Sequence, residues 1–283
     1  MTSKKDCAKR LGIYLLIAFT FSALLIVFLK PMQSSETVSF IVAELFCASP
    51  AIASLITRAV TKEGFSNMKL HLNLTGNLRH YLLAFALPVI GIFVMYLVPV
   101  MVAGHGSWLS GFTFKNVLAC VMILVGQAVM LSIGLLGEEL GWRGYMNQKM
   151  QPLFGTVGTC LLGGIIWGAW HFPIDIANYL AGSGTLRYSL ETAFGRLALL
   201  TCFGVFLMWL TQKTGSVFPA VVAHGIYNAS QSVVMMLLGQ GDIPEDTSLP
   251  LWTDILRYIP MLIIAVIFMI LLLKNKKREN KTL

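Results

Sequence analysis

The chain has 283 residues, of which 56% are hydrophobic and only 12% are charged, and its formal net charge is +8. This composition excludes a soluble globular domain, because such domains carry about 25% charged residues. The basic residues lie in tails and short loops and form no single patch, so the positive charge does not indicate nucleic-acid binding.

Repeated apolar segments are each long enough to cross the hydrocarbon core of a bilayer. They predict an all-α, polytopic transmembrane helical bundle of about eight membrane-spanning helices, in a single domain over 1–283. The expected helices lie at about 11–29, 37–60, 80–103, 116–145, 157–181, 190–211, 216–239 and 252–273. The N-terminal spans occupy about 11–103, unusual polar residues concentrate at about 116–235, and a basic C-terminal tail at 274–283 is expected to be disordered.

The basic residues also predict the orientation of the bundle. With a cytoplasmic N-terminus, most of the 21 Lys and Arg residues fall in inner segments, as the positive-inside rule requires. An even number of spans then places the basic C-terminal tail in the cytoplasm as well, near anionic lipid. We therefore expect a multi-pass protein of the cell membrane with both termini cytoplasmic.

Glu44 is the first acidic residue inside an expected helix. Ionisable residues at membrane depth are costly and are therefore candidates for a functional site. Glu44 either lines a substrate path or pairs with a polar neighbour. The second, simpler interpretation is preferred.

The fourth expected helix ends in the charged run GEELGWRG at 137–144. Residues four apart share a helix face, so Arg143 can neutralise Glu139, whereas Glu138 points elsewhere and has no local partner. A buried carboxylate of this kind suits general acid–base catalysis. The alternative is a charge cluster that caps the helix in the lipid headgroups. Three glycines of this segment would allow a neighbouring helix or a water molecule to approach closely: Gly134, Gly137 and Gly141.

The fifth and seventh expected helices carry one histidine each. Trp167 and His171 share a face of the fifth helix, and His224 and Asn228 share a face of the seventh. The latter two could aim hydrogen-bond donors at one oxygen, as an oxyanion hole requires. Either histidine alone is more simply a structural hydrogen bonder. Two histidines together with the acidic pair favour a hydrolytic site.

These residues can meet only under one condition. Hydropathy alone would end the fourth helix near Gly137 and the fifth near Phe172, on opposite sides of the membrane. At about 1.5 Å per residue, Glu138 and His171 would then lie most of a bilayer apart. A shared site requires the fourth helix to continue past Glu139 and the fifth to begin outside the membrane. We expect a water-filled cavity at such a site.

Three short motifs, in order and sensibly spaced, resemble those of the CPBP family (CAAX protease and bacteriocin-processing, also called ABI) of intramembrane proteases. They are Glu138-Glu139-x-x-x-Arg143, Trp167-x-x-x-His171 and His224-x-x-x-Asn228. The resemblance covers about 116–235, the expected catalytic core. Trp167 is a mild departure, because many members carry Phe there.

The resemblance implies an endopeptidase that hydrolyses a peptide bond in a membrane-associated peptide or protein. Glu138 would activate the attacking water, and His171 would help to hold and polarise it. His224 and Asn228 would stabilise the oxyanion of the tetrahedral intermediate.

The resemblance further implies that Glu139 and Arg143 brace the site, and it leaves the metal question open, because family labels often say metalloprotease. Glu138, His171 and His224 could supply three zinc ligands and leave an open position for water. The sequence contains no H-E-x-x-H motif, however, and asparagine is a poor zinc ligand. A glutamate-dependent hydrolase without a cofactor is therefore preferred.

Two other functions are compatible with such a chain. Relatives of this family act in bacteriocin immunity or bind membrane sensor proteins, which is a non-catalytic role. A proton-coupled transporter would also use intramembrane carboxylates and histidines. Transporters show inverted repeats and paired broken helices, and neither is evident in the sequence.

Overall fold

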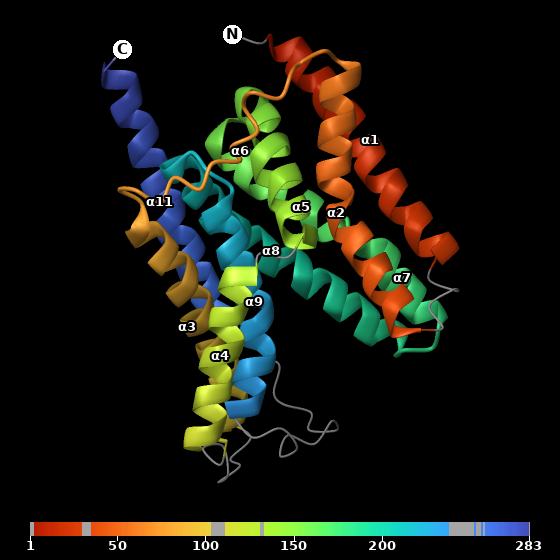
Figure 1. The fold of residues 1–283 in the computed structure, drawn as a ribbon, viewed down its shortest axis with the longest axis vertical. Coiled ribbons are helices and arrows are strands. Elements are labelled where there is room, and N and C mark those ends of the chain that lie inside the picture. Colours follow the sequence, from red (N-terminus) through yellow and green to blue (C-terminus); the bar gives the residue numbers. More distant parts are fainter. Residues whose placement is uncertain are drawn as a thin grey trace.

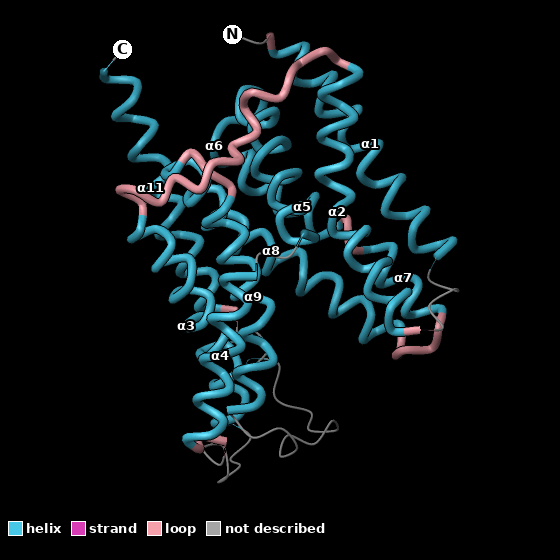
Figure 2. Tube along the Cα trace, in the orientation of Figure 1, coloured by secondary structure: helices cyan, strands magenta, loops and turns pink. Residues whose placement is uncertain are grey.

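The computed structural model describes residues 3–29, 35–102, 111–130, 133–237, 252, 256 and 258–282. Every regular element within these residues is helical, as Figure 2 shows, which confirms the predicted all-α bundle. Among them, five helical segments are long and apolar enough to cross a membrane, and two shorter apolar helices occur at Phe114–Ala128 and Ile259–Asn275. The chain is therefore a multi-pass membrane protein.

The elements follow one another along the chain with short connections. They are α1 (Lys4–Leu29), α2 (Glu36–Val60), α3 (Leu78–Val102), α4 (Phe114–Met130), α5 (Ile133–Gly141), a π-helical turn (Trp142–Met146), α6 (Asn147–Ala169), α7 (Phe172–Leu180), α8 (Leu186–Thr214), α9 (Phe218–Leu237) and α11 (Ile259–Thr282).

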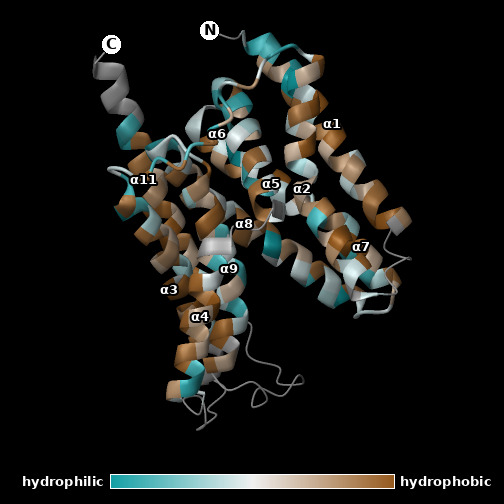
Figure 3. Cartoon of the chain, viewed as in Figure 1, coloured by the Kyte–Doolittle hydropathy of each residue, from teal (hydrophilic) through white to brown (hydrophobic). Residues whose placement is uncertain are grey.

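Two groups of helices flank a central group. Helices α3, α4, α9 and α11 lie on one side and α1, α2 and α7 on the other, with α5, α6 and α8 between them (Figure 1). Both ends of the chain lie at the same end of the bundle, together with the 61–77 segment that joins α2 to α3. Hydrophobic residues cover much of the helices, and hydrophilic residues gather in this segment and at helix ends (Figure 3).

The predicted helix at 116–145 is interrupted in the structure and also extends further than expected. Helix α4 ends at Met130 and α5 begins at Ile133, and residues 131 and 132 lie outside the described part of the chain. Helix α5 then continues without a loop through the π-helical turn into α6. The helical path breaks at Gly155, where φ is 67° and ψ is −175°. A positive φ favours glycine, because a Cβ atom would be strained there.

Gly155 forms the tip of a helical hairpin. Across this hairpin Gly163 faces Asn147, since a Cβ atom at Gly163 would lie 3.1 Å from Asn147 Oδ1. The apolar stretch Gly134–Leu180 contains 47 residues. That corresponds to about 70 Å of helix, enough for two passes through a core of about 30 Å. The hairpin meets the condition for a shared site, because the first arm continues past Glu139.

Two further boundaries differ from the prediction. The helix expected at 157–181 starts directly after the hairpin tip but ends at Ala169, and α7 begins at Phe172 after a turn. Pro173 lies in the first turn of α7, where an N–H group would have no helical partner. The prediction of a disordered tail at 274–283 is wrong for the described residues, because α11 stays helical to Thr282. The lysines and arginine of this segment are good helix formers and allow the last span to extend.

Candidate active site

Helix α5 is held against α2 because glycines leave no side chains between the two helices. A Cβ atom at Gly141 would lie 2.3 Å from Pro50 Cβ, and one at Gly137 would lie 2.6 Å from the Cα of Ala48. Real Cβ atoms do not approach so closely, so a larger residue would push the helices apart. The close helix approach predicted from the glycines is confirmed. It fixes the position of the two acidic residues on α5.

Glu139 is fully buried and accepts two hydrogen bonds on Oε1. The Arg143 Nη1 atom donates at 3.0 Å, and Nδ1 of His224 on α9 lies at 3.0 Å. The first contact is the ion pair that the four-residue spacing predicted. The second joins α9 to α5. Because a carboxylate only accepts, Nδ1 of His224 carries a proton in this arrangement.

Glu138 points away from this ion pair, as predicted. It is 4% exposed, and its Oε2 accepts a hydrogen bond of 2.8 Å from the indole N–H of Trp167 on α6. The thiol of Cys47 on α2 also interacts with this carboxylate. Among the ion pairs of the described residues, none involves Glu138. Its carboxylate is thus held by neutral donors.

His171 lies in the turn between α6 and α7. Its Nδ1 is 3.1 Å from the carbonyl oxygen of Trp167. A carbonyl oxygen only accepts, so Nδ1 carries the proton and Nε2 presents its lone pair. The ring meets that of Trp170 edge-on, with centroids 4.8 Å apart. His171 interacts electrostatically with His224, and His224 does so with Glu138.

The structure therefore gathers most of the predicted residues around the Trp167 indole. These are Glu138, Glu139, Arg143, His171 and His224. Asn228 lies one turn beyond His224 on α9 and is exposed, so it stands at the edge of this cluster.

Sequence reasoning missed two contributors and left a third undecided. Trp167 was treated as a bulky aromatic, yet its N–H group holds Glu138. Cys47 was treated as a buried hydrophobe, and only the folded structure brings it to the site. Glu44 accepts a 2.8 Å hydrogen bond from the backbone N–H of Gly134. It therefore satisfies a free donor in the first turn of α5, as the preferred interpretation expected.

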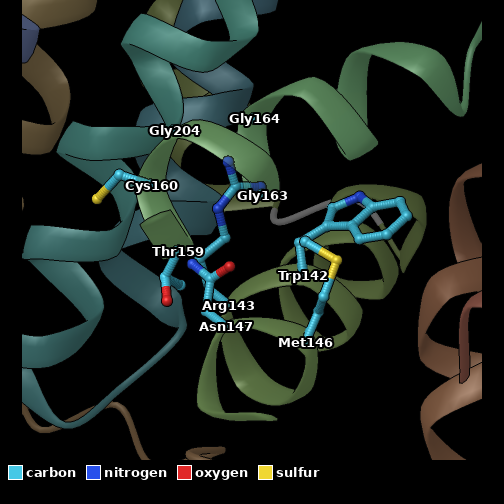
Figure 4. A pocket seen from close by; sticks show the side chains of 9 residues that line it. All are labelled: Trp142, Arg143, Met146, Asn147, Thr159, Cys160, Gly163, Gly164 and Gly204. Atoms are coloured by element: carbon cyan, nitrogen blue, oxygen red, sulfur yellow. The ribbon is translucent and has the colours of Figure 1, made fainter. Parts of the chain in front are cut away.

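A pocket lies on the other side of Arg143 (Figure 4). It is bordered by the π-helical turn, α6 and α8, and its polar groups come from Arg143, Asn147 and Thr159. Three glycines of α6 and α8 leave room for it. Arg143 is the residue that this pocket shares with the cluster. The predicted water-filled cavity around Glu138 and the histidines stays a prediction.

The donor set does not fit zinc in this arrangement. Within the described chain, no three His, Cys, Asp or Glu side chains are grouped so that they could hold a metal ion. The two candidate ligands with known partners are already engaged, since Glu138 Oε2 binds an indole N–H and His224 Nδ1 binds Glu139. No reaction step is therefore derived through a metal.

Comparison with known proteins gives two matches. A family model described as "Type II CAAX prenyl endopeptidase Rce1-like" matches residues 114–230, the segment that carries all three motifs. A protein named CAAX prenyl protease 2 from Methanococcus maripaludis is 25% identical over 227 residues, which cover 79% of this chain and 78% of the relative. Together with the three motifs, these matches show that the chain belongs to the CPBP family of intramembrane endopeptidases.

Proposed function

We propose that this protein hydrolyses a peptide bond in a membrane-associated peptide or protein, with Glu138 as the general base. One observation carries the proposal. Of two adjacent buried carboxylates, Glu139 binds the arginine, whereas Glu138 is held by a neutral indole N–H and lies beside two imidazoles. An ionised carboxylate without an arginine partner can take a proton from water.

In the proposed reaction, Glu138 removes a proton from water while the water oxygen attacks the carbonyl carbon. The C–O bond forms and the carbonyl π electrons move onto oxygen, giving a tetrahedral oxyanion. Glu138 then delivers its proton to the leaving nitrogen as the C–N bond breaks. His171 can assist the first step, because its Nε2 lone pair accepts a hydrogen bond from the same water.

The oxyanion requires hydrogen-bond donors, and His224 and Asn228 are proposed for this role. His224 donates through Nδ1 to Glu139, so only its Nε2 remains for the substrate. Nε2 donates only when both ring nitrogens carry protons, a state that the adjacent carboxylate stabilises. The Asn228 amide always carries donors, and its exposure keeps it accessible to a substrate that enters from the bilayer.

We propose that catalysis needs no metal or other cofactor. The arrangement of the three candidate ligands, which does not fit zinc, supports this. Dialysis of the purified protein against EDTA and then 1,10-phenanthroline should leave the cleavage rate unchanged. Loss of activity that returns with stoichiometric zinc would contradict the proposal.

The proposed substrate is a peptide or protein tail that its own apolar or lipidated segment delivers to the site. The relative's name refers to prenylated substrates. For this chain the supporting features are its membrane helices and the exposed Asn228 at the edge of the cluster. Membrane lipid is thus a partner, and nucleic acid is not proposed as one.

The orientation with both termini in the cytoplasm of the cell is also a proposal. It is supported by the basic residues of the inner segments and by the position of both chain ends at one end of the bundle (Figure 1). Protease-protection of an epitope tag at either terminus in sealed inside-out and right-side-out vesicles tests it.

A substrate screen tests the function. Wild-type protein and Glu138→Gln are reconstituted separately with membrane-anchored peptides that carry a prenyl group, an acyl group or an apolar helix. Mass spectrometry should detect cleavage products with the wild type alone. Equal products from both proteins would remove Glu138 from the mechanism. Intact biological function of Glu138→Gln, by contrast, would favour a non-catalytic immunity or sensor-binding role.

A further inference from the structure

Trp167 contacts more of the cluster than any of its expected catalytic groups. Its indole N–H donates to Glu138 Oε2 at 2.8 Å. The Arg143 guanidinium lies over its ring at 4.0 Å from the centroid. The His224 ring meets it at 5.2 Å in a T-shaped arrangement, and the Trp167 carbonyl contacts His171 Nδ1 at 3.1 Å.

The Trp167 ring is fixed in place from several sides. It is 1% exposed, and the ring of Phe203 on α8 stacks with it at 6.4 Å between centroids. Its helix is pressed against α8, because a Cβ atom at Gly164 would lie 2.3 Å from Thr201. A ring held in this way cannot rotate without displacing its neighbours. The N–H group therefore points in one direction before any substrate arrives.

We propose that Trp167 is a positioning residue that anchors one oxygen of Glu138 and leaves the other for the attacking water. This inference rests on the proposed function of Glu138. A carboxylate with one oxygen held by a rigid donor has a fixed orientation, and the reaction needs no reorganisation of that group. The same side chain also fixes the proton on His171 through its carbonyl oxygen.

Phenylalanine separates the hydrogen bond from the packing. A Phe side chain at 167 retains an aromatic ring under Arg143 and beside Phe203, and it matches the residue that many family members carry. It lacks the N–H donor. Trp209 on α8 supplies the matched control, since it is 6% exposed and packs against Phe206 and Phe268.

The first test compares Trp167→Phe with Trp209→Phe in steady-state cleavage by the reconstituted protein. Loss of a hydrogen bond to a charged group should lower kcat about 10- to 100-fold. KM should change less than about twofold, because the bond orients the base and does not bind substrate. Trp209→Phe should retain the wild-type kcat. Wild-type kcat in Trp167→Phe would overturn the proposal, as would equal losses in both variants.

The second test needs no activity and decides the case in which Trp167→Phe folds poorly. In protein labelled with ¹⁵N at the indole nitrogens, the Trp167 signal is identified by its absence from Trp167→Phe spectra. In Glu138→Ala, the indole proton should move upfield and exchange faster with solvent. An unchanged Trp167 signal would overturn the proposal.

The two proposals fail in different ways. Full activity in Glu138→Gln would remove the proposed function itself. An inactive Glu138→Gln together with wild-type kcat in Trp167→Phe would remove only the positioning role of Trp167.

Discussion

Two groups of buried charges lie along the stretch of chain from α5 to α6. In the first, Glu63 binds Lys149 and accepts a 3.1 Å hydrogen bond from the hydroxyl of Tyr145, and Arg10 lies 3.6 Å away. The Arg58 guanidinium lies over the same tyrosine ring at 4.8 Å. These five residues are called the Glu63 cluster below.

The second group is built differently. Glu139 and Arg143 pair with each other, but the adjacent Glu138 accepts from a neutral indole. In the Glu63 cluster one carboxylate faces several cations, whereas around Glu138 and Glu139 two carboxylates share one arginine. A saturated carboxylate stabilises the fold and has little basicity left. A carboxylate without its own cation is the one that can take a proton.

The largest effect on stability is expected from Glu139→Gln. The change leaves Arg143 buried without a counter-charge, and breaking a buried ion pair costs about 3–5 kcal/mol. The neutral amide also loses part of its hold on His224, so cleavage should fall together with Tm. The matched control is Glu191→Gln, whose pair with Arg187 is exposed at 61% and 87%. That change should alter stability by less than about 1 kcal/mol, as measured by thermal unfolding in detergent.

A smaller effect is expected from Gly141→Ala, which tests whether the contact between α5 and α2 positions the carboxylates. The new methyl group would meet Pro50 at 2.3 Å and would displace α5. Overpacking of this kind destabilises by about 1–3 kcal/mol, and cleavage should fall more than stability explains. Gly126→Ala on α4 is the control, because no atom lies within 4 Å of its added Cβ. Full cleavage in Gly141→Ala would show that this contact does not position the site.

Lys149→Met separates the two charge groups. Removing this ammonium leaves Glu63 with Tyr145 and Arg10, so the free energy of unfolding should drop by about 1–3 kcal/mol. The kcat of the folded fraction should stay at the wild-type value. A fall in kcat without a fall in Tm would mean that the Glu63 cluster takes part in catalysis.

The smallest expected effect is a pH dependence of stability. Burial alone would raise the pKa of the Glu63 carboxyl, but the hydrogen bonds and charges of Lys149, Tyr145 and Arg10 outweigh it and hold the pKa below its ordinary value of 4.5. The stabilisation is therefore complete above pH 4.5 and is lost as the pH falls through the lower pKa of the folded state. In thermal unfolding below that pH, Glu63→Gln should lose Tm less steeply than the wild type. Parallel slopes would contradict this.

Local spacing was sufficient to predict part of this site. The four-residue periodicity of a helix gave the Glu139–Arg143 pair and the separate direction of Glu138, and the glycines gave the close approach of α5 to a neighbour. Hydropathy gave the membrane helices but not the hairpin at Gly155, because apolar residues continue on both sides of the break.

Long-range contacts were not predictable. Glu63 and Lys149 lie 86 residues apart, and nothing in either local sequence indicates the other. Trp167 donates to Glu138 only because the hairpin places α6 beside α5, so its sequence context showed a bulky aromatic and no donor role.

The central claim is that Glu138 acts as a base while Glu139 holds the structure, and one measurement tests it most directly. It determines kcat/KM and Tm for purified Glu138→Gln on a peptide that the wild type cleaves. We predict that kcat/KM falls at least about 100-fold while Tm stays within a few degrees of the wild type. Cleavage at the wild-type rate in the folded variant would contradict the account.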